Sequence, residues 1–121
     1  MNKKLQDLST LLKIKLFKKR DLLETLKKEL LHIETQIQYL QEQIAQFSEA
    51  RHKRFLSRSY TCAYDKYLEH LQREQTSLYK QRMALNTQLH DSYIDIQKHI
   101  DRIKIIEKIR INKYPLKSAN N

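Results

Sequence analysis

The sequence predicts an all-α fold, a long two-helix antiparallel coiled-coil hairpin, and three observations support this prediction. The 121 residues contain no glycine and one proline, Pro115, so the residues that tight turns and strand connections require are scarce. Glu, Gln, Lys, Leu and Ile dominate instead, and the straight-chain members of this set lose little rotamer freedom in a helix. Apolar residues also recur at coiled-coil spacing in two stretches separated by a break. We therefore expect residues 1–121 to form a single coiled-coil domain.

The first helix is predicted over residues 5–47. Apolar residues at alternating steps of three and four form one narrow stripe in this segment, as the seam of a coiled coil requires. The residues between them are mostly polar, which suits a solvated outer face. Ser9 and Lys19 are polar members of the seam, which otherwise consists of Leu5, Leu12, Leu16, Leu23, Leu26, Leu30, Ile33, Ile37, Leu40, Ile44 and Phe47.

A bend is predicted over residues 48–59, because Arg51 and Arg54 take positions that apolar seam residues would hold. The segment contains neither glycine nor proline, so we expect a wider loop or a short helical cap, with one continuous helix as the alternative.

The second helix is predicted over residues 60–113 and carries a more polar seam. It ends before Pro115, since the residue preceding a proline avoids the helical region, and a frayed tail is expected over residues 114–121. The seam consists of Tyr64, Leu68, Leu71, Gln75, Leu78, Arg82, Leu85, Leu89, Ser92, Ile96, His99, Ile103, Ile106 and Arg110.

Net charge is the most informative functional feature. The formal charge of +10 indicates an acidic partner, which could be nucleic acid, anionic lipid or an acidic protein surface. A hairpin would bring the two basic chain ends together, with Ile14, Phe17, Ile105 and Ile109 as apolar residues outside the seam. The basic residues of this end are Lys13, Lys15, Lys18, Lys19 and Arg20 from the first helix and Arg102, Lys104, Lys108, Arg110 and Lys113 from the second.

The same residues argue against an enzyme. A pair of helices offers no shielded pocket for carboxylates to act as general acids or bases, and no two histidines lie three or four residues apart as metal ligands on a helix usually do. We therefore predict no catalytic residue, no metal and no cofactor.

Cys62 is the only cysteine, and no apolar stretch approaches the roughly 18 residues that span a bilayer. Lys13 and Lys15 interrupt any signal-peptide core, so we expect a cytoplasmic protein.

The chain resembles the type III secretion central stalk family, the FliJ and YscO group of flagellar and injectisome proteins. The resemblance rests on a basic, glycine-free two-helix chain with a leading segment LLKIKLFKKR and a second helix that opens with YDKYLEHLQREQTSLYKQR. The short length is similar to the injectisome branch. The resemblance implies a monomeric stalk, one per hexameric secretion ATPase, whose paired termini insert into the ring at the cytoplasmic base of the apparatus.

Two sets of contact residues follow from the resemblance. The residues matching the inserted end are Lys13, Lys15, Lys18, Lys19, Arg20, Lys104, Lys108 and Arg110. The positions matching a contact with the membrane export gate are Tyr67, Leu71, Glu74 and Leu78, of which Glu74 and Leu78 depart from the family pattern. Secretion chaperones are further expected partners, whereas nucleic acid and membrane insertion are not. The alternative is a basic coiled coil that binds nucleic acid or an anionic membrane surface.

Overall fold

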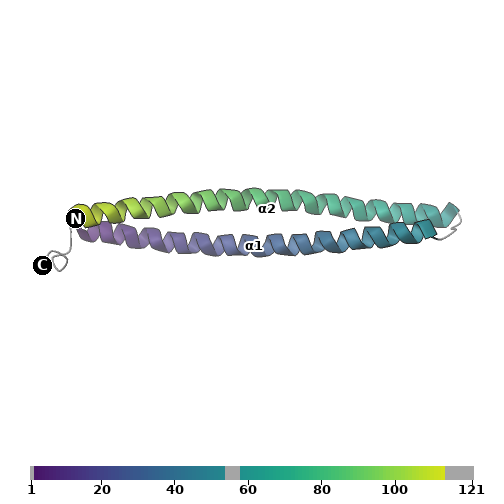
Figure 1. Cartoon of the computed structure of the whole chain (residues 1–121), viewed down its shortest axis with the longest axis horizontal. Helices are drawn as coiled ribbons and strands as arrows, with labels where there is room; N and C mark the ends of the chain where they lie inside the picture. The colour runs from purple at the N-terminus through teal and green to yellow at the C-terminus, as the bar shows by residue number, and fades with distance from the viewer. Residues whose placement is uncertain (1, 54–57, 114–121) are drawn as a thin grey trace. The chain divides into compact units, whose positions relative to one another are not determined.

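The computed structural model describes residues 2–53 and 58–113, and these residues form two helices, α1 (Asn2–Lys53) and α2 (Arg58–Lys113). The predicted all-α helical hairpin is thereby confirmed. The chain divides into two compact units, and each unit takes residues from both helices. Unit 1 comprises residues 1–26 and 88–121, and unit 2 comprises residues 27–87. Within each unit the segments of α1 and α2 lie side by side and run in opposite directions (Figure 1).

The core of unit 1 is the predicted seam. Its buried apolar side chains come from both helices: Leu16, Leu23 and Leu26 of α1, and Leu89, Ile96 and Ile103 of α2. Each such side chain contributes about 2 kcal/mol through removal of apolar surface from water. Two polar seam residues are also buried, Ser9 and His99. His99 is accommodated because its Nε2 lies 2.7 Å from the carbonyl oxygen of Leu12, to which it donates a hydrogen bond.

Unit 2 is built on the same seam. Ile33, Ile37 and Leu40 of α1 and Leu71 and Leu85 of α2 are its buried side chains. The mid-seam position of Arg82 is tolerated because its guanidinium lies over the ring of Tyr79, 5.0 Å from the centroid, as a cation–π contact. The Tyr79 hydroxyl in turn accepts a hydrogen bond of 3.1 Å from Gln41 Nε2. These contacts explain how a seam with polar members still joins the two helices.

The predicted bend over residues 48–59 is too long. Helix α1 continues to Lys53, beyond the predicted end at residue 47, and α2 begins at Arg58, before the predicted start at residue 60. Polar contacts support the extra helical turns where the apolar seam stops, since Arg51 Nε lies 2.6 Å from Asp65 Oδ1 and Lys53 Nζ lies 2.8 Å from Glu49 Oε1. Basic residues in the last turn of α1 also interact favourably with the helix dipole. Residues 54–57 and the predicted tail, 114–121, lie outside the described residues.

Candidate partner-binding surface

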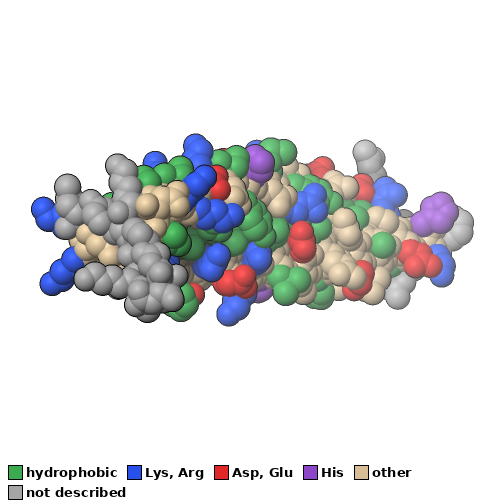
Figure 2. Space-filling model, turned by 60° about the vertical axis from the view of Figure 1, so that its left-hand side comes forward, with side chains coloured by type: hydrophobic (Ala, Val, Ile, Leu, Met, Phe, Trp, Pro, Cys, Tyr) green, Lys and Arg blue, Asp and Glu red, His purple; other side chains and the backbone are tan. Residues whose placement is uncertain are grey.

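The basic residues at the two chain ends are brought together in unit 1. In Figure 2, where this unit is turned toward the viewer on the left, basic side chains lie among hydrophobic ones. Five of the residues expected to contact a secretion ATPase are exposed and have no ion pair among the residues that the structure describes: Lys15, Lys18, Arg20, Lys104 and Lys108. The side chain of Lys113, a further member of the predicted basic end, lies outside the description.

Three other residues of this predicted set are engaged within the protein, and two of them meet at Glu107. The Glu107 carboxylate accepts hydrogen bonds from the buried hydroxyl of Ser9, from Lys13 Nζ at 3.3 Å, and from Arg110 Nε and Nη2 at 3.0 and 2.9 Å. The hydrogen bond from Ser9, followed by those from Arg110 and Lys13, lowers the pKa of Glu107 to about 2. This carboxylate is therefore ionised, and it holds Lys13 of α1 against α2 and pairs with Arg110 within α2.

The third engaged residue is Lys19. Its ammonium forms an ion pair with Asp95, and this hydrogen bond lowers the pKa of the Asp95 carboxyl. Lys19 is a seam residue with a half-buried side chain, so its charge needs a nearby acid. The eight basic residues expected to face a partner are therefore reduced to five, because Lys13 and Lys19 pair with acids of α2 and Arg110 pairs with Glu107 within α2.

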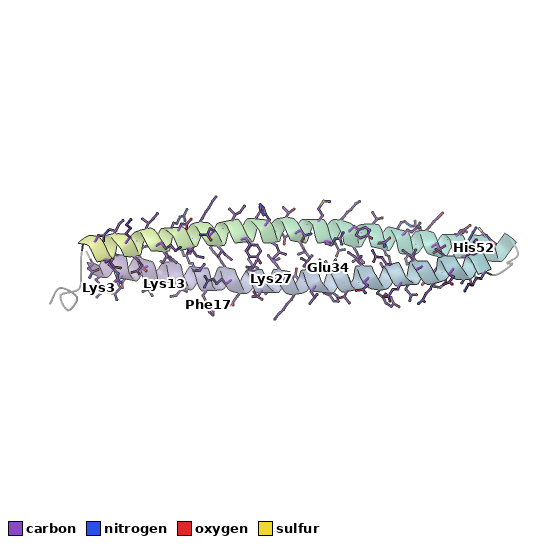
Figure 3. The ribbon with its side chains drawn as sticks, viewed as in Figure 1. Lys3, Lys13, Phe17, Lys27, Glu34 and His52 are labelled. Atoms are coloured by element: carbon purple, nitrogen blue, oxygen red, sulfur yellow. The ribbon has the colours of Figure 1, made fainter. Side chains whose placement is uncertain are left out.

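The off-seam apolar residues of unit 1 are exposed, as the pattern predicts. Ile14 is 49% exposed, Phe17 67%, Ile105 58% and Ile109 38%. Figure 3 shows Phe17 projecting from the side of α1 that faces away from α2. Exposed apolar groups next to unpaired cations favour a binding surface over a merely solvated one, because solvation alone requires no apolar members.

The four predicted export-gate residues do not form one accessible surface. Leu71 is only 4% exposed and packs in the helix interface, so it cannot serve as a partner contact in this structure. The heptad position explains this result, since Leu71 belongs to the seam. Tyr67 packs on Phe47 of α1 with ring centroids 4.6 Å apart, yet it remains 42% exposed. Glu74 is exposed, and its Oε1 lies 3.0 Å from His70 Nε2.

Leu78 and Glu74 line an open hollow of about 660 Å³ between the helices of unit 2. The α1 wall of this hollow includes Tyr39, which is 60% exposed, and the buried Leu40. Tyr39 was not among the predicted contact residues. Its position off the first-helix seam, as a large aromatic side chain in a polar stretch, is the sequence signal that could have identified it.

Glu107 was likewise not singled out from the sequence. It lies beside the seam, where a side chain can reach the paired helix, and it is an acidic residue surrounded by basic ones.

Within residues 2–53 and 58–113, the His, Cys, Asp and Glu side chains form no group of three that could hold a metal ion. Over the same residues, neither α1 nor α2 contains an apolar segment suited to spanning a bilayer. Cys62 is exposed as a free thiol.

Comparisons with protein-family models, with curated proteins and with solved structures give no match to this chain. Its function is therefore inferred from its own residues.

Proposed function

We propose that this protein is the central stalk of a bacterial type III secretion ATPase, similar to the FliJ and YscO group. In this proposal the paired basic ends of the chain enter the hexameric ring and promote its assembly and ATP hydrolysis. A link from the ring to the export gate completes the role. The protein acts by contact and hydrolyses no nucleotide itself.

The observation that carries the proposal is the charge of unit 1. This unit contains both chain ends and presents Lys15, Lys18, Arg20, Lys104 and Lys108 to solvent with no acidic partner in the described part of the chain. An acidic lining inside a ring would complement these charges. Electrostatic complementarity without tight packing favours association while allowing the stalk to move within the ring.

The ion pairs within unit 1 support the same role in a different way. A stalk that enters a ring needs its two helix ends to stay paired, because a separated end would occupy more space. Two ion pairs join α1 to α2, Lys13 with Glu107 and Lys19 with Asp95. Arg110 supports the first of them by pairing with Glu107 within α2. We therefore assign Lys13, Lys19 and Arg110 to maintaining the end, and the five unpaired cations to contacting the ring.

The second contact, with the export gate, is proposed for unit 2. Tyr67, Glu74 and Leu78 are accessible or line the open hollow, and Tyr39 adds an exposed aromatic side chain there. Tyrosines bury a large area while keeping a polar group for hydrogen bonding, which suits a partner interface.

Stimulation of a purified hexameric secretion ATPase tests the ring contact. Reversing Lys15, Lys18, Lys104 and Lys108 to Glu should reduce stimulation at least tenfold, because four attractive charges become repulsive. The matched control also reverses four charges, at the exposed cations Lys28, Lys66, Arg73 and Lys80 of unit 2. The control should keep its stimulation. Unchanged stimulation by the unit 1 variant, with its helicity intact by circular dichroism, would show that the assignment is wrong.

Nucleic acid is the rival partner of a different class, since the positive charge alone would support phosphate contacts. A gel-shift titration with duplex and single-stranded nucleic acid separates the two functions. The stalk function predicts only weak binding that disappears at physiological salt, whereas tight binding with a steep salt dependence would favour the rival.

A further inference from the structure

One flank of unit 1 carries a segregated set of apolar and basic side chains, of which the stalk function uses only Lys15 and Lys18. Each helix has two edges beside its seam, and the Lys13–Glu107 contact shows which edges meet on one side. The other two edges must then meet on the opposite side of the helix pair. Residues seven apart share an edge, so this second flank includes Leu8 and Lys15 of α1 and Arg102 and Ile109 of α2.

The neighbouring outward positions widen this flank into a face of eight side chains. They are Leu11 and Lys18 on α1 and Lys98 and Ile105 on α2, each lying next to an edge residue at a spacing of three or four. We name Leu8, Leu11, Ile105 and Ile109 the apolar quartet. Lys15, Lys18, Lys98 and Arg102 are the basic quartet.

Contacts between the helices show that the two quartets lie at different positions along the axis of the helix pair. Ser9 and Lys13 meet Glu107, Leu12 meets His99, and Lys19 meets Asp95. Residues 8–11 of α1 therefore lie level with residues 105–109 of α2, and residues 15–18 lie level with residues 98–102. Each quartet thus combines side chains of both helices, and the apolar quartet is nearer the chain ends.

Both quartets are available to a partner. The exposed fractions of the apolar quartet are 43% for Leu8, 49% for Leu11, 58% for Ile105 and 38% for Ile109. Every member of the basic quartet is exposed, and none forms an ion pair with any residue that the structure describes. The nearest acid of this flank is Asp95, three residues before Lys98, and its carboxylate is paired with Lys19 and also interacts electrostatically with Lys98. The face therefore combines a net positive charge with aliphatic surface.

We propose that this face binds the surface of an anionic lipid bilayer. The apolar quartet enters the boundary between headgroups and acyl chains, and the basic quartet contacts the lipid phosphates, as on interfacial amphipathic helices. A second copy of the chain is a poor occupant, because it would place lysine against lysine. A tightly packed protein interface is less suitable for the apolar quartet, since the anchors of such interfaces are typically aromatic.

This inference does not depend on the stalk function, although the two share Lys15 and Lys18. A chain lying on the bilayer through these lysines cannot present them to a ring. Anionic vesicles are thus expected to compete with the ATPase, because one molecule of the protein can bind either the membrane or the ring but not both.

Vesicle cosedimentation with the full chain tests the inference. Binding is expected to vesicles of phosphatidylcholine with 30 mol% phosphatidylserine, about tenfold or more above binding to phosphatidylcholine alone. Replacing Leu11 and Ile105 by Ser should lower the partition coefficient by about an order of magnitude. The matched control replaces Phe17 and Ile111 by Ser, because both are exposed apolar residues of the opposite flank. This control variant should bind as the unaltered chain does.

The charge contribution has its own pair of variants. Lys98→Gln with Arg102→Gln should weaken binding to anionic vesicles by roughly tenfold or more, at about one factor of five per basic residue. Lys66→Gln with Arg73→Gln makes the same charge change in unit 2 and should have little effect. Equal losses in the two pairs would show that net charge alone acts and would overturn the proposed face. A protein that stays in the supernatant with anionic vesicles would overturn the proposal as well, and would direct the search to an acidic protein helix.

Discussion

Replacing Glu107 by Ala should destabilise the protein by about 2 kcal/mol. The buried Ser9 hydroxyl is 1% exposed and would lose its acceptor, which costs about 1 to 2 kcal/mol for an unsatisfied buried polar group. The contacts with Lys13 and Arg110 add at most about 1 kcal/mol, because the side chain of Lys13 is 58% exposed and solvent screens these pairs. Urea unfolding followed by circular dichroism measures the sum.

A double-mutant cycle separates the hydrogen bond from the remaining contacts of Glu107. Ser9→Ala and Glu107→Ala, combined, should show a coupling free energy of about 1 kcal/mol, because each single change already removes the shared hydrogen bond. Asp91→Ala is the control, since Asp91 is an exposed carboxylate of unit 1 without a described contact, and its effect should stay within about 0.5 kcal/mol. A Glu107→Ala variant as stable as this control would refute the reasoning.

The same residue sets the direction of the pH dependence. The pKa of Glu107 is about 2 in the folded protein, against an ordinary value of 4.5. A lowered folded-state pKa means that its contribution to stability is fully present above pH 4.5 and is lost as the pH falls toward 2. Glu107→Gln keeps an acceptor for Ser9 but cannot titrate, so its stability should fall less steeply over this pH range.

Three further predictions concern the core, an ion pair and the thiol. Ile37→Ala should cost about 2 to 4 kcal/mol in urea unfolding, because Ile37 is 4% exposed, whereas Leu31→Ala at a 65% exposed position should cost under about 0.5 kcal/mol; equal costs would contradict the seam assignment. Lys19→Met should raise the pKa of Asp95 toward its ordinary value of 3.8 by NMR titration, and an unmoved pKa would show that Lys19 is not the cause. Cys62 should react with a thiol reagent in the folded protein as fast as in urea, and protection would contradict its exposure.

Much of the fold was predictable because the rule that governs it is local. Spacing along the chain decides which side chains of a helix share a stripe, and every residue named in the two seams is buried or half-buried. Ser9, Lys19 and His99 were included as polar seam members, and the structure places each of them there. The exposure of Phe17 and Ile105 followed from the same periodicity.

The helix ends were less predictable, because a helix needs no apolar seam to continue for another turn or two. Residues 48–53 remain helical with contacts such as Arg51 to Asp65, a pair separated in sequence and joined only once the helices meet. A pattern of apolar residues contains no information on such pairs. It therefore placed the end of the first helix too early.

The basic end shows what the sequence determined by itself and what only the tertiary structure decided. The sequence determined that the chain is basic and helical, and that its two ends would carry much of the charge if the helices paired. Only the packing of α1 against α2 decided which charges pair across the two helices: Lys13 meets Glu107 and Lys19 meets Asp95, while Lys15 and Lys18 stay free of ion pairs among the described residues. The physical reason is the sequence separation of the contacts. Helical periodicity relates residues a few positions apart, whereas an ion pair between helices depends on the register of segments far apart in the chain.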